Sequence, residues 1–205
     1  MMTHLNKVRH PRRRRGMIAV AATLLAAELV GCGGGPSVVP ATFTSYNSKD
    51  GTFACDAPEG WEITGGGKRG PVWAKFVSGS AMVKINAGAA GSLMADAMGG
   101  RTADMTAEAP EEAPVHQIHV LKQEAAEDEY PGYAELSAPA TFDCQLGPAR
   151  VSEFTSGGRH GYRATIIAHE KGVDVICLCN ESQWTALKPA FDQILASLER
   201  GVPEL

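Results

Sequence analysis

The chain has 205 residues, of which 44% are hydrophobic, and a formal net charge of -4. This composition excludes a wholly disordered chain, and the length is typical of one domain with short extensions. Residues 1–31 hold six basic residues and one acidic residue, whereas residues 32–205 hold thirteen basic and twenty-two acidic residues, a net charge of -9. An acidic body excludes a nucleic-acid-binding surface, because phosphate contacts need clustered Lys and Arg.

The N-terminal segment has the pattern of an export signal. A basic run, Arg12–Arg15, precedes twelve apolar residues, Gly16–Ala27, which are too few for a bilayer-spanning helix of about 20 residues. The segment ends in Leu29-Val30-Gly31-Cys32, which resembles the bacterial lipobox. The resemblance implies a cleaved lipoprotein signal peptide over residues 1–31, with cleavage between Gly31 and Cys32. It also implies a diacylglycerol on the Cys32 sulfur and acylation of the new amino terminus, for example with palmitate.

Several details bear on this lipoprotein hypothesis. An ordinary secretory signal with a coincidental cysteine is the alternative, and Glu28 departs from the usual pattern. The residues after the paired arginines do not match a twin-arginine signal, which favours general secretion. Acyl chains worth about 0.8 kcal/mol per buried methylene would hold the protein on a membrane. Gly33, where an inner-membrane retention signal has Asp, favours the outer over the inner membrane of the cell envelope.

Residues 32–41 are rich in Gly and Pro and are expected to form a flexible, lipid-anchored tether. The following residues 42–200 are expected to form one α+β domain, with residues 201–205 as a C-terminal tail. The strands expected from alternation and β-type residues are Thr42–Tyr46, Thr52–Asp56, Val72–Val77, Ala81–Ala87, Ala149–Thr155, Tyr162–Glu170 and Val173–Cys179.

The turns and faces follow from the same pattern. Ser78-Gly79-Ser80 predicts a hairpin in which Val72, Ala74 and Phe76 share one face of the first strand. One face of the second strand carries Met82, Lys84 and Asn86, and its other face carries Ala81, Val83, Ile85 and Ala87. Thr64–Gly70 is expected to be a loop, and Lys171-Gly172 a tight turn between the last two strands.

Helical spacing marks three segments. Ser92–Met98 is a candidate short helix, and Val115–Glu129 has apolar residues along one side. The acidic, Pro-bearing segment Thr102–Pro114 between them is expected to be a mobile excursion. Glu181–Arg200 predicts an amphipathic terminal helix; Pro189 would remove one helical hydrogen bond, which predicts a kink or a start near Lys188.

Two motifs in this order resemble the PsbP-like fold. Asp56-Ala57-Pro58-Glu59-Gly60-Trp61 resembles its P-x-G-W entry, and Gly161-Tyr162-Arg163-Ala164-Thr165 with the terminal W-x-x-L-x-P-x-F-x-x-I-L-x-S-L helix resembles its ending. The fold is shared by the extrinsic photosystem II subunit PsbP, a Ran-binding import factor and many bacterial lipoproteins. The resemblance implies a central antiparallel β-sheet with packed helices from Thr42 to Leu198. Its motifs are structural, so neither the photosystem nor the Ran role transfers.

The cysteines allow several chemistries. With Cys32 assigned to lipid, four thiols remain, and export makes their oxidation feasible. Cys177 and Cys179 share one strand face, where mutual bonding is difficult, among apolar neighbours. Buried thiols are the favoured interpretation; a disulfide from Cys55 or Cys144 to this strand, and redox or metal chemistry, are the alternatives.

His116 and His119 lie three apart on the expected helix and are candidate metal ligands. Two ligands do not make a site, so a solvated helix face is the favoured interpretation. His160 and His169 have no visible partners in the sequence. Gly65-Gly66-Gly67 lacks the Lys-Ser/Thr of a phosphate loop, no G-x-S-x-G elbow occurs, and the paired carboxylates lie in polar surroundings.

These patterns predict a non-enzymatic envelope lipoprotein that binds the membrane through its lipid and an unknown envelope protein as partner. No cofactor is expected apart from the covalent lipid on Cys32. The alternative function is metal or small-ligand binding through His116, His119 and nearby acidic residues.

Overall fold

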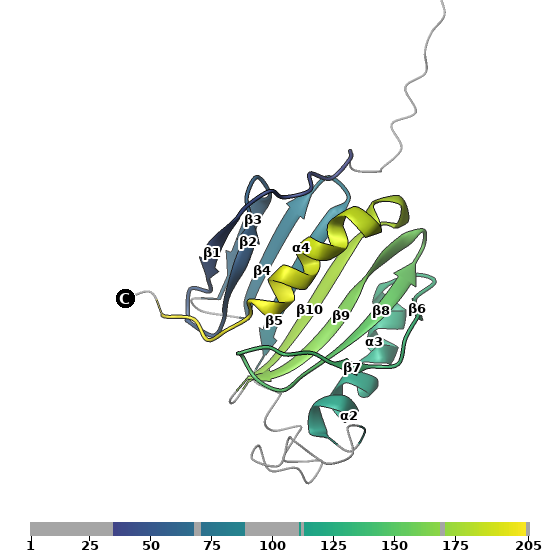
Figure 1. Cartoon of the computed structure of the whole chain (residues 1–205). Helices are drawn as coiled ribbons and strands as arrows, with labels where there is room; N and C mark the ends of the chain where they lie inside the picture. Colours follow the sequence, from purple (N-terminus) through teal and green to yellow (C-terminus); the bar gives the residue numbers. More distant parts are fainter. Residues whose placement is uncertain (1–34, 68–70, 89–110, 112, 169–170, 204–205) are drawn as a thin grey trace, which may run out of the picture. The chain divides into compact units, whose positions relative to one another are not determined.

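The computed structural model describes residues 35–67, 71–88, 111, 113–168 and 171–203. Their main feature is an antiparallel sheet in the order β3-β4-β5-β10-β9-β8-β6, with β7 paired to β8 beside β6 (Figure 1). The strands are β3 (Glu62–Gly66), β4 (Val72–Ser78), β5 (Ala81–Gly88), β6 (Ala134–Glu135), β7 (Ala140–Thr141), β8 (Ala149–Ser156), β9 (Arg159–Ala168) and β10 (Lys171–Asn180).

One face of the sheet carries the main apolar core. Helix α4 (Trp184–Ala196) crosses this face and buries Leu187, Phe191 and Ile194 against it (Figure 1). A separate ribbon of β1 (Phe43–Asn47) and β2 (Ala54–Pro58) packs on the same core, where the ring of Tyr46 meets Phe76 edge-on at a centroid distance of 5.3 Å. Alternation along the strands supplies the apolar residues that this layer covers.

The ribbon also ties the first strands to the end of the chain. Ala54 and Glu199 exchange two backbone hydrogen bonds of 2.9 and 3.0 Å. The Asp56 amide donates to Ser197 Oγ at 2.8 Å, and Gln193 Nε2 donates to the Asp56 carboxylate at 2.5 Å. The C-terminal end of α4 is therefore fixed by residues near the start of the domain.

The opposite face is covered over only part of its width. Helices α2 (Pro114–Leu121) and α3 (Gln123–Glu129) lie behind β8 and β9, with Lys122 between them (Figure 1). Val115 and Ile118 of α2 pack on Ile167. Ala126 of α3 and Tyr130 at its C-terminal end pack on Phe154 and Leu178, while Trp73 of β4 stays exposed.

Most of the expected strands are confirmed, with ends that shift by a few residues. The expected loop at Thr64–Gly70 is wrong in part, because Glu62–Gly66 pairs with β4 as an edge strand. The expected turn at Lys171-Gly172 is wrong, because both residues belong to β10 and Lys171 pairs with Ala168 of β9. β6 and β7 have two residues each and give no periodic signal in the sequence.

Two of the expected helices are interrupted in the structure. Val115–Glu129 is two helices rather than one, and Glu181–Arg200 is a 3-10 turn, η2 (Glu181–Gln183), followed by α4. Pro189 lies inside α4, five residues after the first residue of the helix, Trp184. The expected helix Ser92–Met98 and most of Thr102–Pro114 lie outside the described residues.

The expected tether differs from the structure in its described part. The Ala81 amide donates to Ser37 Oγ at 2.9 Å, and the Trp61 indole donates to the Val38 carbonyl at 2.9 Å. Gly35–Ala41 therefore lies along the domain as a bound segment, hereafter the strut, whereas Cys32–Gly34 lie outside the described residues. No helix in the described ranges is both long and apolar enough to span a membrane.

Candidate functional site

The half of the sheet that α2 and α3 leave uncovered carries rows of side chains that follow the strand register. One row runs from Trp73 of β4 to Asn86 of β5 and Asp174 of β10. The next row runs from Lys75 to Lys84 and then to Ile176. These residues point away from the α4 core, because their neighbours Ala74, Phe76 and Ile85 are fully buried on the other side.

Trp73 lies flat across the edge of the sheet. Its register partner on β3 is Gly66, where an added Cβ would come within 2.5 Å of the indole Nε1. The missing side chain at Gly66 therefore provides the space that the indole occupies. Trp73 retains 36% of its surface exposure, whereas Trp61 and Trp184 are buried. The exposed indole is an apolar platform with a polar N–H.

Lys75 and Lys84 are directly opposite each other in the β4–β5 pairing. Like charges at opposed positions of an antiparallel pair destabilise it, by up to about 1 kcal/mol. Lys84 is partly compensated by Glu129 at 3.1 Å, a pair in which both side chains are about one third or more exposed. Lys75 has no ion pair within the described part of the chain. The fold itself thus gives no stabilising reason for a lysine at position 75.

Two adjoining hollows surround this pair. The larger, of about 370 Å³, is lined by Trp73, Lys75, Met82, Lys84, Asn86, Glu129 and Tyr130. The second, of about 270 Å³, reaches under α3 toward Lys122, Arg163 and Asp174 and shares four lining residues with the first. We call the two together the α3 groove. Its volume is in the range of small-ligand or side-chain binding sites.

Charges in the deeper part of the groove are paired. Lys122 Nζ binds both carboxylate oxygens of Asp174 at 2.6 and 2.7 Å. Arg163 is buried; it donates to the Glu135 carboxylate, to Tyr133 at 2.9 Å and to the His119 carbonyl at 2.7 Å. The partners of Arg163 hold this part of the wall in place, because a buried charge without partners is strongly destabilising, whereas the Lys122–Asp174 pair is partly exposed.

His119 lies in this wall rather than on a solvated helix face. Its ring is fully buried, with Nδ1 at 3.1 Å from Thr165 Oγ1 and Nε2 at 2.9 Å from Ser152 Oγ. Burial, together with the positive charges of Arg163, Arg150 and Lys122 and the nearby His116, lowers the pKa of His119 to about 3. The imidazole is therefore neutral at physiological pH, and one hydroxyl donates to it while it donates to the other.

The two candidate metal ligands are not brought together with a third. Both ring nitrogens of His119 already have hydroxyl partners, while Nδ1 of His116 is buried without a hydrogen-bond partner among the described residues. Within those residues, no group of three His, Cys, Asp or Glu side chains is arranged to hold a metal ion. A metal site at His116 and His119 would require His119 to leave Thr165 and Ser152.

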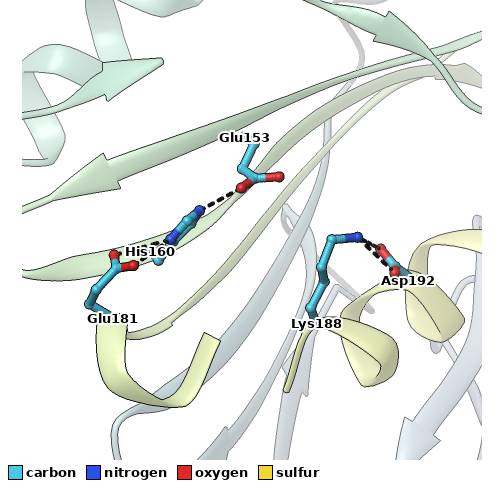
Figure 2. A network of polar contacts seen from close by, with 5 residues as sticks. All are labelled: Glu153, His160, Glu181, Lys188 and Asp192. Atoms are coloured by element: carbon cyan, nitrogen blue, oxygen red, sulfur yellow. Dashed lines mark hydrogen bonds and ion pairs between the residues drawn. The ribbon is translucent and has the colours of Figure 1, made fainter. Parts of the chain in front are cut away.

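His160 has partners that the sequence did not reveal. Its Nε2 is 2.7 Å from Glu153 of β8, and its Nδ1 is 3.0 Å from Glu181 of η2 (Figure 2). Lys188 and Asp192 pair nearby along α4 at 3.0 Å (Figure 2). The contacts of His160 with Glu153 and Glu181 join η2 to the sheet. Only 8% of the His160 side chain is exposed, so the imidazole has no open approach for a ligand.

The four cysteines outside the lipobox carry free thiols in the structure. Cys55, Cys177 and Cys179 are buried in the core under α4, and Cys144 is half-buried with its Sγ 3.3 Å from the Leu198 carbonyl. Burial raises the pKa of Cys55 to about 12 and that of Cys179 to about 11, and it raises the pKa of Cys177 well above the ordinary value. Such thiols are poor nucleophiles.

The remaining sequence candidates are placed as follows. Gly31 and Cys32 lie outside the described residues, as does His169. The sequence did not identify the lining residues of the α3 groove as a site. It did place Lys75, Lys84 and Asn86 at alternating positions of the two expected strands. Their common face became a candidate site only when the register placed Trp73 and Lys75 opposite Asn86 and Lys84.

Comparison with known proteins shows the fold. No family model and no curated protein matches the chain. Cyanobacterial PsbP (CyanoP) from Synechocystis sp. PCC 6803 matches with a TM-score of 0.53 at 14% identity, over 83% of this chain and 98% of that chain. The α+β domain therefore has a PsbP-like fold, as the sequence motifs predicted. The identity is too low for the likeness to carry a function.

Two other solved structures match less well. A Pseudomonas aeruginosa protein of unknown function, PA94, gives a TM-score of 0.38 at 15% identity, covering 74% of this chain and 92% of that chain. LpqN of Mycobacterium tuberculosis, described as involved in cell envelope biogenesis, gives 0.38 at 11% identity, covering 78% and 91%. At these scores neither structure contributes to the argument about this chain.

Proposed function

We propose that the mature chain is a lipid-anchored accessory protein of the cell envelope, non-enzymatic, which binds a partner protein in the α3 groove. The partner's binding segment is acidic and carries an apolar or aromatic side chain. The anchor rests on the lipobox Leu29-Val30-Gly31-Cys32, and the outer membrane is favoured by Gly33. The groove supplies the binding surface.

The observation that carries the proposal is the opposed pair Lys75 and Lys84 beside the exposed Trp73. Two cations facing each other weaken the hairpin, and a bound carboxylate between them would relieve that repulsion. The indole offers a face for an apolar side chain next to the carboxylate. Of the cations that line the groove, Lys75 has no ion pair within the described residues, so a partner carboxylate can pair with it by charge complementarity.

A binding role agrees with the chemistry of the described side chains. Among the groups with strongly perturbed pKa values, His119, Cys55 and Cys177 are buried and have no open approach, and burial also raises the pKa values of Tyr130 and Tyr133, so both phenols stay protonated. Arg163, Lys122 and His160 are held in ion pairs that support the fold. The groove, by contrast, presents side chains with hydrogen-bonding and charged ends at a solvent-accessible surface.

Binding is tested with defined peptides on the lipidated protein purified in detergent. The probe is a fluorescein-labelled decapeptide of alternating Glu and Phe, with Lys-Phe and Glu-Ser decapeptides as matched controls, followed by anisotropy. We expect the Glu-Phe peptide to bind at least tenfold more tightly than either control. Lys75→Glu should weaken binding at least tenfold, whereas Lys49→Glu, a reversal at an exposed lysine in the β1–β2 turn, should leave it unchanged.

Equal binding of the acidic and basic peptides, or equal effects of Lys75→Glu and Lys49→Glu, would contradict the groove assignment. The anchor has a separate test: Cys32→Ser should move the protein from the membrane fraction to the soluble fraction. Continued membrane retention of Cys32→Ser would contradict the lipid anchor while leaving the peptide result valid.

A further inference from the structure

The strut is bound to one end of the sheet by a set of hydrogen bonds. Ser37 Oγ is 3.2 Å from both Ser80 Oγ and Gln183 Oε1, and it accepts from the Ala81 amide at 2.9 Å. The Val38 amide donates to Ser78 Oγ at 2.9 Å. The strut is thereby joined to the β4–β5 turn and to η2.

Two further features fix the strut. The carbonyl of Val38 accepts from the indole of Trp61, and this indole packs edge-on against Phe191 of α4 at a centroid distance of 6.4 Å. Gly79 in the β4–β5 turn has a φ of +54°, and a Cβ there would overlap the carbonyl of Gly35. The strut thus crosses the turn at a point where only glycine leaves room for it.

Two other turns lie at the same end of the domain. Arg159 of β9 donates to the Ser80 carbonyl at 3.2 Å, and the Glu181 amide donates to the Gly158 carbonyl at 3.1 Å. We call this set, Ser78–Ala81, Gly157–Gly158 and Asn180–Gln183, the strut end. The opposite end of β10 begins at Lys171, which binds Asp50 at 2.8 Å. The ten residues of β10 separate the two ends by about 30 Å.

Cys32 lies three residues before Gly35, so its Cα is within about 11 Å of the strut whatever conformation the intervening chain has. We infer that the strut end of the domain faces the membrane and that the strands of the sheet run away from the bilayer surface. This inference rests on the proposed lipid anchor. It assigns the lipid surface as the partner of the strut end, where Val38 and Val39 are 57% and 51% exposed.

The orientation has a consequence for the α3 groove. The groove lies on a face of the sheet and not at a strand end. With the strut end against the bilayer, the groove opens sideways, along the plane of the membrane. A partner protein anchored in the same membrane can then reach the groove from the side, without passing over the end of the domain that faces away from the bilayer.

The orientation is tested with fluorescent labels at the two ends. Asn180→Cys marks the strut end and Lys49→Cys the far end; both positions are exposed. A Cys144→Ser background removes the half-buried thiol, and the buried thiols are left in place. The lipidated proteins are reconstituted in phosphatidylcholine vesicles that contain a lipid with a nitroxide on its headgroup. We expect quenching of the label at position 180 to be at least threefold stronger than that at position 49.

Equal or reversed quenching on protein that floats with the vesicles would overturn the orientation. Protein that does not float would instead contradict the lipid anchor, so the two failures are distinguishable. A double variant tests the strut itself: Ser37→Ala with Trp61→Phe removes the hydrogen bonds of the Ser37 hydroxyl and the bond from the indole to the Val38 carbonyl, while the Val38 amide bond to Ser78 and an aromatic ring at position 61 remain. Vesicle flotation should persist, and the quenching difference should shrink at least twofold; an unchanged difference would contradict the role of the strut.

Discussion

The imidazole of His160 stacks on the indole of Trp184, with ring centroids 4.1 Å apart and planes inclined by 8°. Its Nε2 lies 2.7 Å from Glu153 and its Nδ1 lies 3.0 Å from Glu181. The stacked ring thus links β8, β9 and the start of the C-terminal helix.

Replacing His160 should therefore destabilise the domain. We expect His160→Ala to lower the free energy of unfolding by about 1–3 kcal/mol, because it leaves two carboxylates facing each other and uncovers Trp184. Urea unfolding followed by tryptophan fluorescence measures this. Lys188→Ala is the comparison variant: it removes a partly exposed i,i+4 pair with Asp192 worth about 0.3–0.5 kcal/mol and a cation–π contact with Tyr162 worth about 0.5–1 kcal/mol. Equal losses in the two variants would show that the His160 contacts add nothing.

The pair Lys75 and Lys84 predicts a variant that gains stability. Lys75→Glu converts a like-charge cross-strand pair into an attractive one, so the free energy of unfolding should rise by about 0.2–1 kcal/mol. The same variant is the one expected to lose peptide binding. A gain in the midpoint of urea unfolding combined with weaker binding would mark Lys75 as a functional residue. A loss of stability would mean that Lys75 has a structural role.

His119 predicts a pH dependence of stability. In the unfolded chain this histidine takes up a proton near its ordinary pKa of 6.5, whereas in the folded domain it stays neutral down to about 3. Unfolding therefore takes up a proton between these values, so the contribution of His119 is complete above pH 6.5 and declines as the pH falls toward 3. At pH 5 the loss is at most about 2 kcal/mol.

The variant His119→Gln keeps hydrogen-bonding capacity toward Ser152 and Thr165 but does not titrate. We expect its stability to fall less than that of the parent protein between pH 7.5 and pH 5, in urea unfolding at constant ionic strength. The other carboxylates and histidines contribute equally to both proteins. Parallel pH profiles would therefore contradict the burial of a neutral His119.

The thiols predict a labelling pattern. In the folded mature protein at pH 8, Cys144 should react with a maleimide first, because Cys55, Cys177 and Cys179 are buried and their pKa values are raised. After denaturation, protein from oxidising export should yield four reactive thiols, because the proposed lipid occupies the Cys32 sulfur. Two or zero thiols would instead support the disulfide alternative between Cys55 or Cys144 and β10.

Metal binding through His116 and His119 is tested by calorimetric titration with Zn²⁺, Cu²⁺ and Mn²⁺. Because both nitrogens of His119 are engaged with hydroxyl groups, we expect no heat that depends on these residues. The comparison is the double variant His116→Ala, His119→Gln, with circular dichroism as a check of folding. Heat that is present in the parent and absent in the double variant would support the metal alternative.

The sequence predicted those parts of the fold that depend on local patterns. Alternation identified the β4–β5 hairpin and its buried face, and the Trp184–Leu198 spacing identified the terminal helix with its buried stripe. The break at Lys122 could not be foreseen, because the apolar spacing continues across it. The edge strand Glu62–Gly66 was hidden by glycines, which favour a loop in isolation and form a strand here through pairing with β4.

The candidate site depended on contacts between distant residues. The pairing of Lys84 with Glu129 joins positions 45 apart, and that of His160 with Glu181 joins η2 to β9. A single sequence contains no signal for such pairs. The His116–His119 spacing, in contrast, was a strong local pattern, but tertiary packing placed the two rings in different surroundings.

The backbone bridge between Ala54 and Glu199 has a consequence for biogenesis. It joins an early strand to a residue 145 positions later, so the ribbon and α4 acquire their native contacts only after residue 199 is available. An N-terminal part that emerges before residue 199 cannot complete this core by itself. A chain truncated before residue 199 would lack the residues that close the core.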